Sequence, residues 1–306
     1  MALDALAGDP RRFHPVAGFG RAASWLEQRV WSDSRGRGAV FTAVCVGASA
    51  ALGLAATRLA GSSSLARIGM TALATWATIG AKSLVAEGLE VHRLLDAGDL
   101  PGARQQITHL VGRDPSHLNA DEIARAAVES VAENSSDAIV APLVWGAIAG
   151  VPGLLGYRAA NTLDAMVGYR NPRFERFGWA SARLDDAVNF IPARLTGAVV
   201  SLLSDKPRAA WTITRRYARQ HPSPNSGWCE ASYAATLDLQ LGGTNTYGER
   251  VEHRPRLGEG RAPTANDIAR AVTLTNHVIL ITSAGTAAAA LGITPLVTRI
   301  RRRSHH

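Results

Sequence analysis

Five long apolar runs alternate with polar segments along the chain. The first, third and fifth runs contain no Asp, Glu, Lys or Arg, and each is long enough to cross a hydrocarbon layer of roughly 30 Å as a helix. Uncharged runs of this length favour transmembrane helices over the buried helices of a soluble protein. The five runs are Ala39–Thr57, Ile68–Ala86, Ala138–Tyr157, Ala187–Ser204 and Val272–Thr298.

This pattern predicts an all-α, multi-pass integral membrane protein with four to five apolar helices in a single membrane-embedded domain, residues 1–306. Arginines cluster before the first run and after the last, so the positive-inside rule assigns both ends to the cytoplasm. Five simple crossings would separate the ends, and we therefore expect one run to be re-entrant or interfacial. The fourth run is the candidate because it contains Pro192 and Arg194.

The polar segments between the runs are expected to face the cytoplasm, at about residues 87–137, 158–186 and 205–271. Asn119 followed by Glu122 is typical of a helix N-cap, and the helix should continue toward Asn134. Residues 205–271 are rich in turn-forming sequences and predict loops and short helices. The charged residues before the first run argue against a cleavable signal peptide.

The net positive charge of the chain limits the classes of molecule that it is expected to bind. The net charge is +8 and nearly all of it comes from arginine, since Lys82 and Lys206 are the only lysines. Because no nucleic-acid-binding motif accompanies the arginines, we expect anionic lipid or phosphorylated small molecules and no nucleic acid. Cys45 and Cys229 lack the spacing of a zinc site. The oligomeric state is left open.

Three acidic residues, Glu129, Glu133 and Asp137, are spaced four apart and should share one helix face. Like charges at this spacing repel, and a divalent cation such as Mg²⁺ would compensate them. The alternative is a solvent-facing acidic surface in which Arg125 pairs with Glu129.

Two further clusters adjoin apolar runs. Asn161 and Asp164 lie one turn apart between Arg158 and Arg170, and Asp185 and Asp186 follow Arg183. Amide, carboxylate and guanidinium groups together suit a phosphate and its metal ion, although a capped helix with surface ion pairs explains the first cluster equally well.

Two loops and one arginine complete the candidates. Prolines stiffen the loop that presents His221 and Asn225, and residues 242–248 could approach a phosphate through backbone amides without forming a P-loop. Arg194 either has a partner or a cavity, or extends to the lipid headgroups.

At these residues the chain closely resembles the CobD/CbiB family, the adenosylcobinamide-phosphate synthases of cobalamin biosynthesis. Each motif is modest, but their order along the whole chain is specific. The motifs are Gly8-Asp9-Pro10, His14-Pro15-Val16, Glu129 to Asp137, Asn161 to Asp164, Tyr169-Arg170-Asn171, Gly178-Trp179-Ala180, Arg183 to Asp186, Pro192 to Leu195, His221 to Asn225, and Gly242 to Gly248.

The resemblance implies a multi-pass enzyme of the cell membrane with its active face in the cytoplasm. It implies ATP-dependent amide formation between a propionate carboxylate of adenosylcobyric acid, a corrinoid, and (R)-1-amino-2-propanol phosphate or free aminopropanol. ATP and Mg²⁺ are the expected cofactors. A magnesium-dependent membrane phosphotransferase or prenyltransferase, and a non-catalytic membrane scaffold, are the alternatives.

The chemistry of that reaction distributes roles among the candidates. Activating a carboxylate with ATP requires metal ligands and positive charge around phosphoryl oxygens, and amine attack requires a base. The expected catalytic residues are Glu129, Glu133, Asp164 and His221, with the base left open. The expected metal ligands are Asp137, Asp185 and Asp186. The expected substrate-binding residues are Arg158, Asn161, Arg170, Arg183, Arg194, Asn225, Asn245 and Tyr247.

Overall fold

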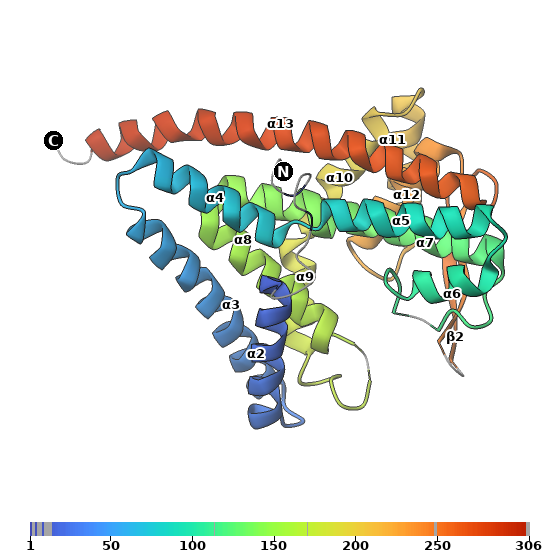
Figure 1. The fold of residues 1–306 in the computed structure, drawn as a ribbon, viewed down its shortest axis with the longest axis horizontal. Coiled ribbons are helices and arrows are strands. Elements are labelled where there is room, and N and C mark those ends of the chain that lie inside the picture. Colours follow the sequence, from blue (N-terminus) through green and yellow to red (C-terminus); the bar gives the residue numbers. More distant parts are fainter. Residues whose placement is uncertain are drawn as a thin grey trace. The chain divides into compact units, whose positions relative to one another are not determined.

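The computed structural model describes residues 1, 4, 8, 14–112, 114–169, 171–247 and 250–303. Within them the chain is helical except for one hairpin, as Figure 1 shows. It divides into two compact units. One comprises Met1–Ile79, Ala141–Asp185 and Leu280–His306, and the other comprises Gly80–Val140 and Asp186–Ile279.

The first unit is built around the pairing of α3 (Arg35–Leu59) with α8 (Ala141–Val167), which α2 (Pro15–Val30) and α4 (Ser64–Thr78) accompany. The two helices approach closely at Gly53, where an added Cβ would lie 2.8 Å from the backbone of Pro152. Phe41 of α3 packs on Phe177 with ring centroids 5.2 Å apart. Small residues at a close helix crossing are typical of helices that associate within a membrane.

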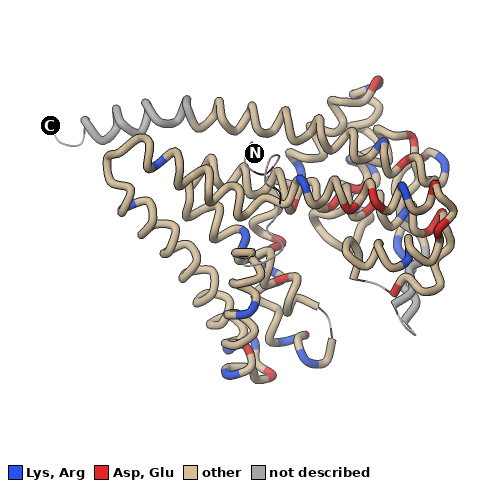
Figure 2. Tube along the Cα trace, viewed as in Figure 1, with Lys and Arg blue, Asp and Glu red and all other residues tan. Residues whose placement is uncertain are grey.

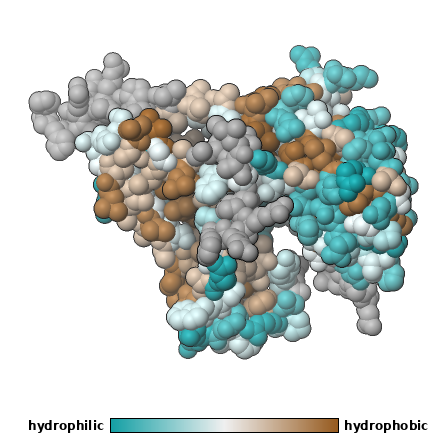
Figure 3. Space-filling model, viewed as in Figure 1, coloured by the Kyte–Doolittle hydropathy of each residue, from teal (hydrophilic) through white to brown (hydrophobic). Residues whose placement is uncertain are grey.

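The apolar surface of α3 is largely uncovered. Only 22% of its most apolar 18-residue window is buried, and Val40, Leu52 and Leu59 are each at least 65% exposed. Figure 2 shows no charge along the middle of this helix, and Figure 3 shows apolar atoms gathered over α3 and α4. A core helix of a soluble protein would be buried instead, so these surfaces need an apolar environment.

Two helical segments among the described residues are long and apolar enough to cross a membrane, Arg35–Leu59 and Ala120–Val167, and the second is kinked at Gly150, whose φ is +63°. The first and third apolar runs fall within them. The larger count of four to five spanning helices stays a prediction, as does the re-entrant run.

The second apolar run is divided between two helices. α4 ends at Thr78, and α5 (Ala81–Asp96) begins after Gly80, whose N–H donates to the carbonyl of Ala138 at 3.2 Å. Ile79 and Ala81 are buried. The residues next to the helix break are therefore buried, whereas Ile68 and Leu73, in the α4 part of the run, are exposed.

The second unit surrounds α7 (Ala120–Ser135). α7 contacts α5, α6 (Leu100–Ile107) and α12 (Ser226–Leu237), and in Figure 1 it runs beside α5. Its expected start is confirmed, because Asn119 and Glu122 form a reciprocal capping box. α10 (Phe190–Leu202) and α11 (Pro207–Tyr217) pack on α12, which is buried along most of its length.

The remaining elements frame these helices. A π-helical turn, Ser136–Val140, joins α7 to α8, and α9 (Trp179–Val188) is separated from α10 by Asn189 within the fourth apolar run. A short 3₁₀ turn, Ala218–Gln220, follows α11. α13 spans Ala265–Arg303 and contains the fifth run.

The hairpin of β1 (Leu241–Tyr247) and β2 (Arg250–Leu257) was not expected in a segment predicted as loops and short helices. Its strands are mostly polar, so the sequence lacks the alternation that identifies a strand. Leu241 and Leu257 pair at its base and are fully buried. Two buried leucines therefore anchor a hairpin whose remaining sequence is typical of a loop.

The start of α13 is fixed by a buried carboxylate. Arg261 donates both guanidinium nitrogens to Asp267, at 2.7 and 2.9 Å, and Arg270 and the N–H of Thr264 donate at 2.7 and 2.8 Å. Burial alone would raise the pKa of Asp267, but these hydrogen bonds outweigh it and hold the pKa well below its ordinary value.

We expect Asp267→Asn to destabilise the second unit by about 1–3 kcal/mol at pH 7, through loss of a cap and of charged hydrogen bonds. Because the folded pKa is depressed, this stabilisation is complete above the unfolded value of about 3.9 and is lost as pH falls toward the folded pKa. Melting curves in detergent should therefore converge for wild type and variant below about pH 4. A constant difference between them down to pH 2 would contradict this account.

Candidate functional site

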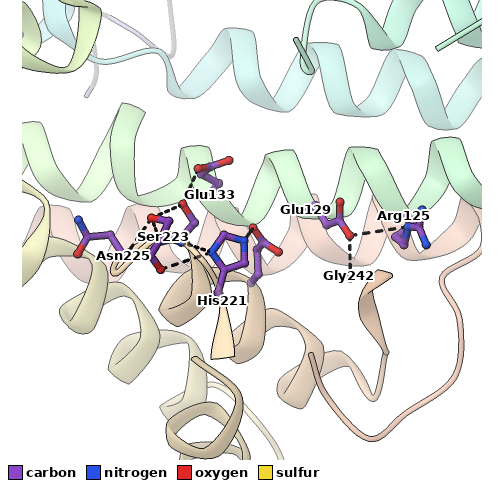
Figure 4. A network of polar contacts seen from close by, with 9 residues as sticks. Arg125, Glu129, Glu133, His221, Ser223, Asn225 and Gly242 are labelled. Carbon is purple, nitrogen blue, oxygen red and sulfur yellow. Dashed lines mark hydrogen bonds and ion pairs between the residues drawn. The ribbon is translucent and has the colours of Figure 1, made fainter. Parts of the chain in front are cut away.

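Glu129, predicted as a catalytic residue, is a buried carboxylate held by the base of the hairpin. Its Oε1 accepts the N–H of Gly242 at 2.8 Å and lies 3.8 Å from Nε of Arg125 (Figure 4). The strand register shifts between Leu241 and Gly243, which indicates a β-bulge, and the bulge turns the Gly242 N–H toward the helix. The Arg125–Glu129 pair of the alternative interpretation is present, but it lies in a buried setting.

Gly242 is required at this bulge. Its φ is +80°, and an added Cβ would lie 2.1 Å from the carbonyl oxygen of Pro255. The backbone amide expected to meet a phosphate at this position is instead occupied by the Glu129 carboxylate.

Glu133, one turn later on α7, belongs to a chain of side-chain contacts with the 221–226 loop. Its Oε1 accepts the hydroxyl of Ser226 at 2.6 Å, and Ser226 and Ser223 have their hydroxyl oxygens 3.1 Å apart. Figure 4 shows Glu133 and Ser223 on the two sides of this chain of contacts. The loop is thereby tied to the helix through a carboxylate.

His221 is buried, and its tautomer follows from its partners. Nδ1 accepts the N–H of Ser223 at 3.0 Å, so the proton of the neutral ring lies on Nε2. Nε2 is 3.4 Å from Oε1 of Glu230, and both side chains are at most 5% exposed. The Nδ1 contact ties His221 to the 221–226 loop, and its predicted role as a base stays a prediction.

Three carboxylates line one small cavity. Glu129, Glu133 and Glu230 border about 140 Å³, together with Ser130 and Arg254. Glu230 is 2% exposed. Carboxylates gathered in so confined a space require positive charge or hydrogen-bond donors nearby, and Arg254 supplies one guanidinium.

Asp137, a predicted metal ligand, lies in the π-helical turn that ends α7. The chain adopts π-helical geometry after Ser135, which interrupts the regular α-helical spacing at Asp137. Burial, and next the nearby charges of Asp137 and Glu133, raise the pKa of the Cys229 thiol well above its ordinary value. Both carboxylates therefore lie near this thiol.

Asn225 joins two other predicted residues in the second unit. Its Nδ2 donates to the backbone carbonyl of Asp186 at 2.8 Å, and its Oδ1 accepts Nη1 of Arg194 at 3.3 Å. Arg194 also donates to the carbonyl of Phe190 at 2.7 Å and stacks on the Phe190 ring at 3.4 Å. The partner expected for Arg194 is thus the 224–225 loop and its own helix.

In the first unit, Asn161 bridges Arg158 and Asp185. Nη1 of Arg158 lies 3.4 Å from Oδ1 of Asn161, whose Nδ2 donates to Oδ1 of Asp185 at 3.3 Å. Asp164 is partly buried near the end of α8, where its Oδ1 would be 1.9 Å from a Cβ added to Gly168. The close approach leaves room for no side chain at position 168.

For the remaining predicted site residues, the structure gives less detail about their surroundings. Arg183 is exposed on α9. Arg170 lies outside the described residues, and of Asn245 and Tyr247 only the backbone, in β1, is described. No group of three or more His, Cys, Asp or Glu side chains suited to a metal ion occurs in the part of the chain that the structure describes.

Several residues of the site were not predicted: Ser223, Ser226, Glu230, Arg125 as a cavity residue, and Arg254. A signal for Glu230 exists, since it is the one acid in an otherwise uncharged helix that is buried along most of its length. Ser226 and Arg254 give none, because serines and arginines are common on loops and strands.

Comparison of the sequence with known proteins shows a cobalamin-pathway protein family. The CobD/Cbib protein family matches residues 1–275, and the chain belongs to it.

Curated relatives carry the same assignment in their names. The chain is 49% identical over 280 residues to the cobalamin biosynthesis protein CobD of Mycobacterium tuberculosis H37Rv, which covers 90% of this chain and 89% of the relative. It is 44% identical over 274 residues to the protein of that name from Geobacter metallireducens, covering 86% of each. No solved structure matches it.

We expect the Cys229 thiol to resist alkylation in the folded protein, because burial and neighbouring carboxylates disfavour the thiolate. Peptide-resolved mass spectrometry after maleimide treatment at pH 8 should find Cys229 modified only in denaturant. A cysteine introduced at exposed Ser116 serves as the reactive control. Labelling of Cys229 as fast as this control would contradict the buried environment.

Proposed function

We propose that this protein is an ATP-dependent amide ligase of cobalamin biosynthesis. It joins (R)-1-amino-2-propanol phosphate, or free aminopropanol, to a propionate carboxylate of adenosylcobyric acid. The observation that carries the proposal is the 49% identity, over nearly the full length, to a relative named cobalamin biosynthesis protein CobD. The substrates, ATP and Mg²⁺ come from the family resemblance.

The reaction proceeds in two displacements. A propionate oxygen attacks the γ-phosphorus of ATP, the bond from that phosphorus to the bridging oxygen breaks, and ADP leaves. The amine then attacks the acyl carbon of the acyl phosphate, the bond from carbon to phosphate oxygen breaks, and the amine proton passes to a base. Both steps need positive groups near phosphoryl oxygens.

Glu133 is the base that the contacts favour. It lines the carboxylate cavity and is only partly buried, whereas Glu129 is held by Gly242 and His221 is buried with its Nδ1 accepting the Ser223 N–H. Ser226 fixes one of its oxygens at 2.6 Å, which orients the carboxylate. A base must be positioned before its pKa matters.

The donor set is compatible with Mg²⁺ held in part by substrate. Mg²⁺ usually takes one or two carboxylates and completes its shell with water and phosphate oxygens, so a ready-made cluster of three is not required. Asp185, oriented by Asn161, would provide such a ligand in the first unit, and Asp137 and Asp186 are the candidates in the second. When bound, the ion neutralises phosphate charge.

The proposed location is the cell membrane, with the ATP-using face in the cytoplasm. The uncovered apolar surface of α3 and the length of the helix 120–167 support membrane insertion. The sequence has more arginines before α3 than in the segment that joins it to α4, which supports a cytoplasmic N-terminal side.

Purified wild-type protein with ATP, Mg²⁺, adenosylcobyric acid and the phosphorylated amine should release ADP and form the amide. Asp185→Asn should lower kcat/KM by about 100-fold, the scale of losing one electrostatic contact to a transition state, while the protein still inserts and folds. Exposed Asp205→Asn is the matched control and should retain activity. Amide formation at the wild-type rate in Asp185→Asn would remove that residue from the site.

Cysteine labelling tests the topology of α3. Ser62, exposed in the turn after α3, and Gly36, exposed in its first turn, lie at opposite ends of the helix, and both native cysteines are buried. An impermeant maleimide should label Ser62→Cys in intact cells and Gly36→Cys only after permeabilisation. Equal labelling of both in intact cells would rule out a crossing by this helix.

A further inference from the structure

A second cavity in the second unit, of about 500 Å³, lies between the first turn of α7 and the base of the hairpin. A volume of this size accommodates a small organic ligand. Its charged lining consists of Arg125, Arg254 and Arg256 together with Asp121 and Glu122.

The three arginines reach this cavity from two elements. Arg254 and Arg256 both line the cavity from β2, on either side of the bulge opposite Gly242, and Arg125 comes from the second turn of α7. Gly243 allows the Arg125 side chain to come close to the hairpin backbone. Its φ is +98°, and an added Cβ would lie 3.0 Å from Nη1 of Arg125. Guanidinium groups from separate elements form the forked donor set that binds phosphate oxygens.

The two carboxylates in the cavity lining affect which phosphate-containing molecules can bind. Glu122 has one oxygen engaged by the Asn119 N–H at 2.9 Å, and Asp121 is exposed beside it. A triphosphate would meet repulsion from both acids. A small molecule that carries an amine and a single phosphate would instead match a lining with charges of both signs.

We propose that this cavity binds the phosphate of a small aminoalkyl phosphate. The assignment of that ligand as the amine substrate rests on the proposed function, and it selects the phosphorylated acceptor over free aminopropanol. Arg254 also lines the carboxylate cavity of Glu129, Glu133 and Glu230. Phosphate bound at Arg254 therefore lies beside carboxylates able to accept the proton of the amine.

The test is calorimetric binding of (R)-1-amino-2-propanol phosphate to full-length protein in phosphatidylcholine nanodiscs, without ATP or corrinoid. Wild type should bind it, and Arg254→Lys and Arg256→Ala should each weaken binding by about tenfold, through loss of charged hydrogen bonds. Arg256 is exposed, so its removal spares the fold. Exposed Arg208→Ala, on α11 away from the cavity lining, should bind as wild type does.

Three further results decide the matter. Free aminopropanol should bind at least about tenfold more weakly than its phosphate. Unchanged affinity in both Arg254→Lys and Arg256→Ala overturns the assignment, and so does competition by phosphatidylethanolamine added to the nanodiscs, which would give the cavity to a lipid headgroup.

The experiments distinguish failure of the ligase proposal from failure of the binding-site proposal. If wild type binds the phosphate through these arginines yet forms no amide with all substrates present, the ligase proposal fails and the binding site stands. If amide forms with an unchanged KM for the phosphorylated amine in Arg256→Ala, the ligase stands and the binding site is rejected.

Discussion

The second unit depends on one constraint, the need to compensate carboxylates that are buried on α7 and α12. Glu129 and Glu230 are each at most 7% exposed, and a carboxylate removed from water without compensation destabilises a fold by several kcal/mol. The compensation comes from distant parts of the chain. Gly242 reaches Glu129 from the hairpin and His221 faces Glu230 from the loop before α12.

This compensation explains features that otherwise look unrelated. The bulge at Gly242 interrupts the hairpin ladder, but it releases the N–H that Glu129 accepts. The prolines of the 221–225 loop hold His221 where Ser223 fixes its tautomer. A buried helix with acids on one face thus dictates the conformation of two loops, and each loop brings further polar groups to the carboxylate cavity.

Features that depend on neighbouring residues were predictable from the sequence. Contacts between distant residues that compensate buried carboxylates were not. The capping box at Asn119 was predicted because its two residues are three apart, and the uncharged stretch of α3 was predicted from composition alone. The division of the second run at Gly80 was missed, since burial and lipid contact favour the same residue types. The hairpin was missed because only Leu241 and Leu257 anchor it.

The candidate site shows the same difference between local patterns and long-range contacts. Glu129 and Glu133 were identified from their spacing, but the partners of Glu129 and Glu133, Gly242 and Ser226, lie 113 and 93 residues away and carry no chemical signal of their own. The role of His221 could not be derived either. Its residue type suggests a base, but its burial and its contacts with Ser223 and Glu230 depend on the fold. Residue types suggested which side chains could act, but they did not predict which of these side chains are buried.

The distances around Glu129 indicate how charge is shared between the two cavities. The Gly242 N–H is at hydrogen-bonding distance from the carboxylate, 2.8 Å, whereas Nε of Arg125 is an ion-pair partner at 3.8 Å. The backbone amide therefore supplies the direct hydrogen bond, and the guanidinium contributes by charge, which falls off slowly with distance. An arginine that stabilises a carboxylate by charge alone does not need to direct its Nη groups at that carboxylate. These groups can therefore face the neighbouring cavity. Arg125 thus lies beside a buried acid and in the lining of the second cavity, and under the proposed binding of an aminoalkyl phosphate it would couple the two cavities.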